Sequence, residues 1–273
     1  MPLLAVKVLL APAFVVAASL AARRYGPRIG GLIAGLPVVA GPILLVYALQ
    51  HGDAFAAHAS VGALLGLVSL IAFVVVYARL APSGFWGHCA LAGWGAFAVA
   101  TLIFSQLRFS AGVALAIAGV AFVVGLTLAP KPASEPPPAG PAPSWDLPLR
   151  ALCALVLVLA LTAAAGWLGP RWSGLLTPFP VIGTVLATFT HAQHGADVVR
   201  RMLRWLLAGY GAFALFCFTL AETLVPLGTA ASFALALAIA VLVQGTLILA
   251  IARVHDGRLV EAPTGEPSGL ERL

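Results

Sequence analysis

Hydrophobic residues fill this chain in runs of about 20 residues, which is the length of helix needed to cross the ~30 Å hydrocarbon layer of a bilayer. Short segments rich in glycine, proline and charged residues separate the runs. We therefore predict an all-α polytopic membrane protein. The nine predicted transmembrane helices cover residues 3–22, 30–50, 60–80, 86–105, 109–129, 147–168, 173–193, 203–224 and 229–253.

The composition supports this class. Hydrophobic residues make up 62% of the chain and charged residues only 9%, whereas a soluble domain carries about 25% charged residues. The net charge is +6, but the basic residues lie at the ends of the predicted helices, where anionic lipid headgroups attract them. No basic face with interleaved aromatic residues points to nucleic acid. The three cysteines lie inside predicted helices as small hydrophobic residues and predict neither disulfides nor a metal centre.

The two halves of the chain repeat the same motifs at one constant offset. Gln50-His51-Gly52 returns as Gln193-His194-Gly195, and 195 − 52 = 143. The same offset relates the other repeated motifs, which are Gly26-Pro27-Arg28 with Gly169-Pro170-Arg171 and Pro37-Val38 with Pro180-Val181. Transporter folds are commonly built from two repeats around a central site. The first helix could instead be a cleaved signal peptide, but Lys7 aligns with Arg150, so we predict that this helix belongs to the repeating unit.

The lysines and arginines fall unevenly on the two sides of the predicted helices. Twelve lie on one side and three on the other, and the richer side is cytoplasmic. The N-terminus is then outside and the C-terminus cytoplasmic, in a bacterial-type inner (plasma) membrane. The twelve are Arg23, Arg24, Arg28, Arg79, Lys131, Arg150, Arg200, Arg201, Arg204, Arg253, Arg258 and Arg272, and the three are Lys7, Arg108 and Arg171.

Five predicted helices precede the second copy, so the second copy enters the membrane in the opposite orientation and forms a 4+1+4 inverted repeat. One local match favours another register, because Leu91–Ala98 resembles Leu207–Ala214 at an offset of 207 − 91 = 116. We prefer the offset of 143 because it agrees with the charge bias. The expected organisation is a first repeat within 1–129, including a linking helix at 109–129, a proline-rich cytoplasmic linker at 130–146, the inverted repeat at 147–253, and a disordered cytoplasmic tail at 254–273.

The segment Gly174-Leu175-Leu176-Thr177-Pro178-Phe179-Pro180 resembles a glycine–leucine–proline stretch in the GlpM-like family of small inner-membrane proteins with four transmembrane helices. The resemblance covers residues 147–253 and, more faintly, 4–105. This chain departs from the family in being doubled, with a ninth helix between the copies. The resemblance implies a fused pair of antiparallel units and at most a link to alginate production, so it supports architecture more than function.

Paired proline and glycine interruptions mark the second and seventh predicted helices. A proline inside a helix leaves a carbonyl unpaired, and in lipid such a break is tolerated where it is buried or lines a cavity. Interruptions at corresponding positions of two repeats indicate a midplane binding site, although kinks that permit close packing would give the same pattern. The residues predicted to bind substrate are Gly35, Pro37, Gly41, Pro42, Tyr47, Thr177, Pro178, Pro180, Gly183 and Thr184.

Few ionisable residues lie inside the predicted helices. His51 and His194 are candidates for coupling or gating, or else they are polar helix ends followed by a capping glycine. Glu222 is the carboxylate within a predicted helix and the candidate for proton coupling. Arg28 and Arg171 could contact an anionic substrate or headgroup, or anchor their helices at the interface.

These observations predict a secondary transporter or exporter of a small neutral, amphipathic or lipid-like molecule, working by alternating access. Its expected partners are membrane lipids and the substrate. No Ser-His-Asp set, phosphate-binding loop or zinc signature points to an enzyme, and we expect no cofactor, metal or nucleic acid. The alternatives are a non-transporting membrane partner in envelope polysaccharide or lipid assembly, and a channel. A homodimer or an envelope-assembly partner is compatible with the prediction.

Overall fold

The computed structural model describes residues 2–37, 40–131, 143–168 and 179–260, and every element in these ranges is a helix. The predicted all-α class is therefore confirmed for the described chain. The helices are α1 (Pro2–Tyr25), α2 (Pro27–Ala34), α3 (Ala40–His51), α4 (Asp53–Leu80), α5 (Trp86–Ser105), α6 (Ala111–Leu128), α7 (Asp146–Leu168), α9 (Val181–His194) and α10 (Ala196–Val260).

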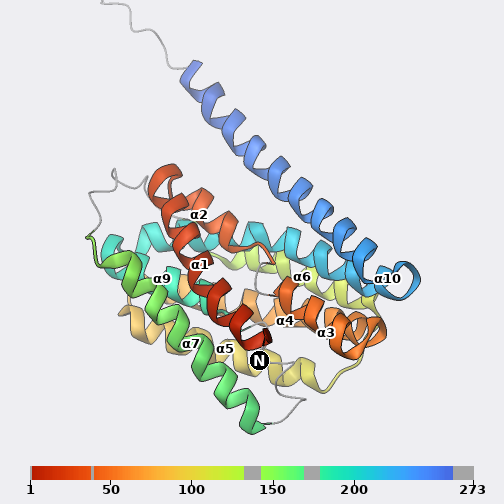
Figure 1. The fold of residues 1–273 in the computed structure, drawn as a ribbon. Helices are drawn as coiled ribbons and strands as arrows, with labels where there is room; N and C mark the ends of the chain where they lie inside the picture. Colours follow the sequence, from red (N-terminus) through yellow and green to blue (C-terminus); the bar gives the residue numbers. More distant parts are fainter. Residues whose placement is uncertain (1, 38–39, 132–142, 169–178, 261–273) are drawn as a thin grey trace, which may run out of the picture.

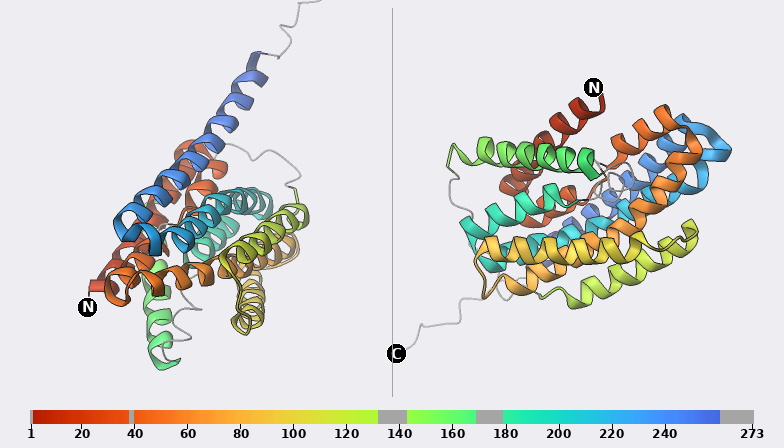
Figure 2. Two further views of the ribbon diagram at one scale, coloured as in Figure 1. Left: turned by 90° about the vertical axis from the view of Figure 1, so that its right-hand side faces the viewer. Right: turned by 90° about the horizontal axis from the view of Figure 1, so that it is seen from below.

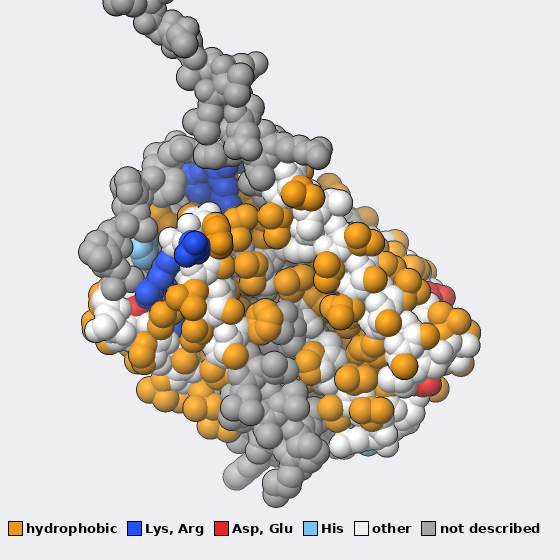
Figure 3. Space-filling view, turned by 45° about the horizontal axis from the view of Figure 1, so that its top comes forward, with side chains coloured by type: hydrophobic (Ala, Val, Ile, Leu, Met, Phe, Trp, Pro, Cys, Tyr) orange, Lys and Arg blue, Asp and Glu red, His pale blue; other side chains and the backbone are white. Residues whose placement is uncertain are grey.

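Four of these helices are long and apolar enough to cross a membrane. They are α4, α5, α6 and α10 over residues 196–250. Many large apolar side chains on them are exposed, as lipid-facing side chains would be, and the face drawn in Figure 3 is mostly hydrophobic, with lysines and arginines gathered toward one side. The chain is thus a helical protein with several helices compatible with a membrane. That each of the nine expected segments spans the membrane stays a prediction.

The expected second helix, 30–50, is two helices with a break between them. Helix α2 ends at Ala34, and Gly35, Leu36 and Pro37 are not helical. A proline ring clashes with the carbonyl four residues earlier and disfavours helical backbone in the residue before it, so a helix cannot run through Pro37 undisturbed. In the second copy the equivalent proline, Pro180, caps the start of α9. The predicted interruption is therefore confirmed at Pro37. At Pro180 the structure describes the start of a helix, and residues 169–178 before it lie outside the described residues.

Helix boundaries recur at the offset of the sequence repeat. Gly52 and Gly195 connect successive helices with φ of 87° and 81°, a backbone conformation that glycine adopts readily and other residues rarely do. The other equivalent boundaries are the helix ends His51 and His194, and the helix starts Asp53 and Ala196. The two halves thus share the same order of helix end, glycine turn and helix start around Gly52 and Gly195.

Helix α4 and the first part of α10 pack against each other at the centre and run in opposite directions (Figures 1 and 2). At one end of α4, the Tyr77 hydroxyl lies 3.4 Å from Nδ1 of His191 near the end of α9. At the other end, Thr229 donates a hydrogen bond to Asp53. The 28 residues of α4 span about 42 Å, so Gly52 and Gly195 lie at opposite ends of a membrane-length helix.

Helix α10 contains two of the expected transmembrane segments. They join at Gly228, whose φ of 75° turns the chain, shortly after Pro226. The second part of α10 runs back along α2, where the Gln244 amide donates to the Leu32 carbonyl at 2.7 Å, and it projects beyond the body (Figures 1 and 2). The helix extends to Val260, so the segment 254–260, expected as disordered tail, is helical. Residues 261–273 lie outside the described residues.

Candidate functional site

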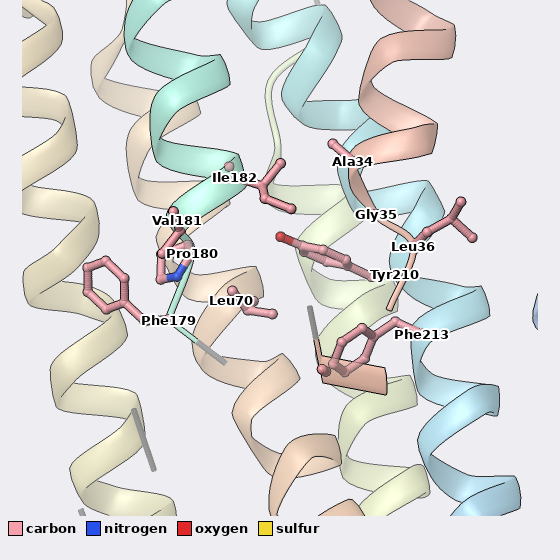
Figure 4. A pocket seen from close by; sticks show the side chains of 12 residues that line it. Ala34, Gly35, Leu36, Leu70, Phe179, Pro180, Val181, Ile182, Tyr210 and Phe213 are labelled. Carbon is pink, nitrogen blue, oxygen red and sulfur yellow. The ribbon is translucent and has the colours of Figure 1, made fainter. Parts of the chain in front are cut away.

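A central cavity of about 70 Å³ lies between the break after α2 and the start of α9 (Figure 4). The first break contributes its backbone and small side chains on one side, and the start of α9 contributes the other side. Helices α4 and α10 complete the walls. The lining residues are Ala34, Gly35, Leu36, Ala40, Leu70, Phe179, Pro180, Val181, Ile182, Gly183, Tyr210 and Phe213.

The cavity is lined by equivalent positions from both copies of the repeat. Three pairs of lining residues are separated by 143 positions, namely Leu36 with Phe179, Ala40 with Gly183, and Leu70 with Phe213. The end of α2 and the start of α9 therefore line the same cavity, together with the long helices α4 and α10. The cavity marks the place where the two copies meet, and it is the candidate site.

Tyr210 is the one residue with a polar side chain among the described lining residues. It is only 5% exposed, and Figure 4 shows its hydroxyl pointing from α10 across the cavity toward the start of α9. This hydroxyl has no hydrogen-bond partner within the described part of the chain. A buried phenol normally finds a partner, so Tyr210 has an unused donor facing the cavity.

The first turn of α9 offers backbone donors to the same space. The amide of Val181 bonds to the Phe179 carbonyl and that of Thr184 bonds to the Pro180 carbonyl, both at 2.8 Å. The amides of Ile182 and Gly183, between them, have no backbone partner among the described residues. The first amides of a helix point along its axis and carry the positive end of its dipole.

A close crossing of α2 and α10 forms one wall of the cavity. A Cβ built on Gly35 would lie 2.7 Å from the Cα of Gly209, and one built on Gly209 would lie 2.8 Å from the Leu32 carbonyl oxygen. The two backbones therefore touch directly, which only glycine permits on both sides. Gln244 is 4% exposed and donates to the Leu32 carbonyl from the second part of α10, so it helps to satisfy the broken end of α2.

Helix α5 holds the start of α9 in place. Nε1 of Trp94 donates to Oγ1 of Thr184 at 3.0 Å, and the Trp94 ring packs against Phe179 with centroids 5.6 Å apart. The edge of Phe97 packs on the same Phe179 ring. Thr184, expected to bind substrate, thus serves as a structural acceptor behind the cavity wall.

The structure brings together part of the set of residues predicted to bind substrate. Gly35, Pro180 and Gly183 line the cavity. Pro37 is buried in the break, and Gly41 and Pro42 lie in the first turn of α3, where Gly41 faces Phe216. Tyr47 lies away from the cavity and stacks with His51 and Phe55 near the end of α3. Thr177, Pro178 and Arg171 fall outside the described residues.

The candidates for coupling and headgroup contact lie elsewhere. His51 and His194 are exposed at the ends of α3 and α9, and Glu222 is exposed on α10. Arg28 is half-buried in the first turn of α2. None of these four lines the cavity as described. No group of three or more His, Cys, Asp or Glu among the described residues is placed to hold a metal ion.

A buried ionic cluster ties three helices together at the end of the fold that holds Gly195. Asp146, fully buried at the start of α7, accepts hydrogen bonds from Arg23 of α1, from Arg150 one turn along α7 at 2.9 Å, and from Gln193 of α9. Arg150 also donates to Gln193 at 3.2 Å. Burial alone would raise the pKa of Asp146, but the hydrogen bonds from Gln193, Arg150 and Arg23 outweigh burial and lower that pKa below its usual value. We call these four residues the Asp146 cluster.

Arginines also hold the end of α6 at this side of the molecule. Arg204 of α10 donates to the carbonyls of Leu126 and Ala129 at 2.9 and 3.0 Å, and Arg79 of α4 donates to the Leu128 carbonyl at 3.0 Å. These are the carbonyls that the end of a helix leaves without partners. Several basic residues assigned to one side by the charge pattern therefore meet at one end of the fold.

The sequence analysis missed Tyr210 and the Asp146 cluster. A signal existed for each, because Tyr210 lies in the repeated Leu207–Ala214 motif and Asp146 precedes Arg150 by four residues, the spacing of an ion pair on a helix. Neither signal says which helix face is turned toward the cavity or toward α1. Comparisons of this chain with protein-family models, with curated proteins and with solved structures find no match.

Proposed function

We propose that this protein is a secondary transporter of the inner membrane that works by alternating access. One observation carries the proposal: the central cavity is lined by equivalent residues of the two copies, between the end of α2 and the start of α9. Transporters built from repeats hold their substrate near the bilayer midplane at the repeat interface, between discontinuous helices. A cavity lined by both halves of the chain, between the end of one helix and the start of another, is what such a site would require.

The placement of Gly52 and Gly195 at opposite ends of α4 supports an inverted relation between the copies. If α4 spans the bilayer, equivalent turns of the two copies face opposite sides of the membrane. Two half-folds of opposite orientation can exchange conformations, and the exchange opens the shared cavity to one side and then to the other. The arginine-rich end would be cytoplasmic, which places the N-terminus outside and the C-terminus inside.

The Asp146 cluster suggests how the cytoplasmic end would close. It joins α1, α7 and α9 through charge-assisted hydrogen bonds around a carboxylate that is fully buried. The positions of the first copy that are equivalent to Asp146 and Arg150 are Leu3 and Lys7, so the cluster is not repeated in sequence at the outer end. This asymmetry would favour closure of the cytoplasmic end in the conformation described here.

Among the predicted cargo classes, the cavity favours a small amphipathic molecule. Its volume of about 70 Å³ is far below the ~300–1,000 Å³ of pockets for drug-sized ligands. A whole lipid does not fit in it. Apolar side chains dominate the lining, with the Tyr210 hydroxyl as a polar contact.

A topology map tests the proposal. Paired alkaline phosphatase and fluorescent-protein reporters inserted after Gly52 and after Gly195 should report opposite sides of the membrane. The same side at both points would remove the basis for alternating access and would favour the membrane-partner alternative. Alanine substitution at Pro37 and Pro180 gives a second test, because transport that survives both changes would argue against a site at the breaks.

A further inference from the structure

We propose that the central cavity binds the carboxylate of a small monocarboxylate with a short apolar tail, such as propionate. This inference rests on the transporter proposal, because it assigns a ligand class to the same cavity. It combines a buried, unpartnered donor side chain, a helix N-terminus directed at the same space, an apolar remainder, and a volume that admits only a few non-hydrogen atoms.

The donors converge from two elements. The hydroxyl of Tyr210 reaches across the cavity from α10 toward the first turn of α9, where the amides of Ile182 and Gly183 have no backbone partner among the described residues (Figure 4). A hydroxyl and two adjacent amides can bind the two oxygens of one carboxylate. The positive end of the α9 dipole adds attraction for negative charge.

The helix start that lines the cavity in the second copy has a counterpart in the first copy. Ala40, at the start of α3, lines the cavity at the position equivalent to Gly183 at the start of α9. The start of a helix from each half of the chain therefore lines the cavity. No charged side chain in the described lining would repel an anion.

The lining also limits the charge and the size of the ligand. No Lys, Arg, Asp or Glu is among the described lining residues, so the site has no counter-charge for a multivalent anion, whose desolvation would be costly. A monoanion that spreads its charge over two oxygens costs less to desolvate. Leu70, Phe179 and Phe213 would receive a short alkyl group, and the volume of about 70 Å³ accommodates a two- or three-carbon acid.

Binding to the purified full-length protein in detergent tests the inference without depending on transport. Sodium propionate should bind saturably in calorimetry and stabilise the protein against thermal unfolding, as a ligand of the folded state must. Propionamide has the same shape without the charge and should bind at least about 10-fold more weakly, since hydrogen bonds to charged groups are the stronger ones. Octanoate should be rejected by the small volume.

Two matched variants connect the binding to the cavity. Tyr210→Phe removes only the hydroxyl and should weaken propionate binding about 10-fold or more. Tyr25→Phe makes the same chemical change at a side chain that is 64% exposed at the end of α1, and it should leave binding unchanged. Equal binding of propionate and propionamide, no binding of propionate, or a Tyr210→Phe variant with wild-type affinity would each overturn the inference. The reporter map tests the transporter proposal by a different measurement, so a failure of that proposal can be told apart from a failure of this inference.

Discussion

The crossing of α2 over α10 should be intolerant of a single methyl group. Alanine at Gly209 would place its Cβ 2.8 Å from the Leu32 carbonyl oxygen and 3.0 Å from the Cα of Gly35. Both neighbours are backbone atoms in packed helices, so neither can rotate away as the end of a side chain could. The methyl group is accommodated only if α2 moves away from α10.

The expected cost follows from two opposing effects. Overpacking of a close contact costs about 1–3 kcal/mol. Replacement of glycine by alanine inside a helix stabilises the helix by up to about 1 kcal/mol. Gly209→Ala should therefore lower stability by up to about 2 kcal/mol. Gly211 is the matched control, because it lies two residues further along the same helix and a Cβ there meets nothing within 4 Å. Gly211→Ala should be neutral or slightly stabilising.

Thermal unfolding of both variants in the same detergent, at one heating rate, measures the difference. For a chain of this size a loss of 1 kcal/mol lowers the midpoint by about 2–4 °C, so Gly209→Ala should unfold several degrees below Gly211→Ala. Ligand binding gives a second measurement, since movement of α2 displaces Gly35 in the cavity wall. A Gly209→Ala protein as stable as the Gly211→Ala protein would refute the direct backbone contact.

The polar contacts give three further predictions. Asp146→Asn should destabilise the protein by about 3 kcal/mol at pH 7, because it leaves the buried charge of Arg150 uncompensated. Because the folded state lowers the pKa of Asp146, the ionised carboxylate contributes its full stability above the ordinary aspartate pKa of about 3.9, and this contribution is lost as pH falls through the lower folded pKa. The difference in unfolding temperature between wild type and Asp146→Asn should therefore be smaller at pH 3 than at pH 7. Arg204→Gln should release the end of α6 and speed its amide hydrogen exchange, whereas unchanged exchange there would contradict the capping role. Thr101→Val should cost about 1 kcal/mol, because the buried Thr101 hydroxyl donates to Ser69 at 2.9 Å, and the double variant with Ser69→Ala should recover part of that loss in a thermal double-mutant cycle.

The sequence by itself determined the local features whose causes are local. Runs of apolar residues predicted helices, and the helices are present in the described chain. The prolines at 37 and 180 predicted interruptions, and the chain is not helical at Pro37 and starts α9 directly after Pro180. The repeated Gly52 and Gly195 marked turns, and both have the positive φ that glycine tolerates.

The tertiary structure decided which side chains face the shared cavity. In an apolar chain nearly every face of a helix is hydrophobic, so periodicity does not separate the lipid-facing side from the buried side. Tyr210 faces the cavity and Glu222 is exposed because α10 packs on other helices, and one such contact, between Gly209 and Gly35, joins residues far apart in the sequence. The burial of Asp146 likewise depends on Arg23 and Gln193 arriving from α1 and α9. Such positions follow from how helices pack, and only the folded chain brings their partners together.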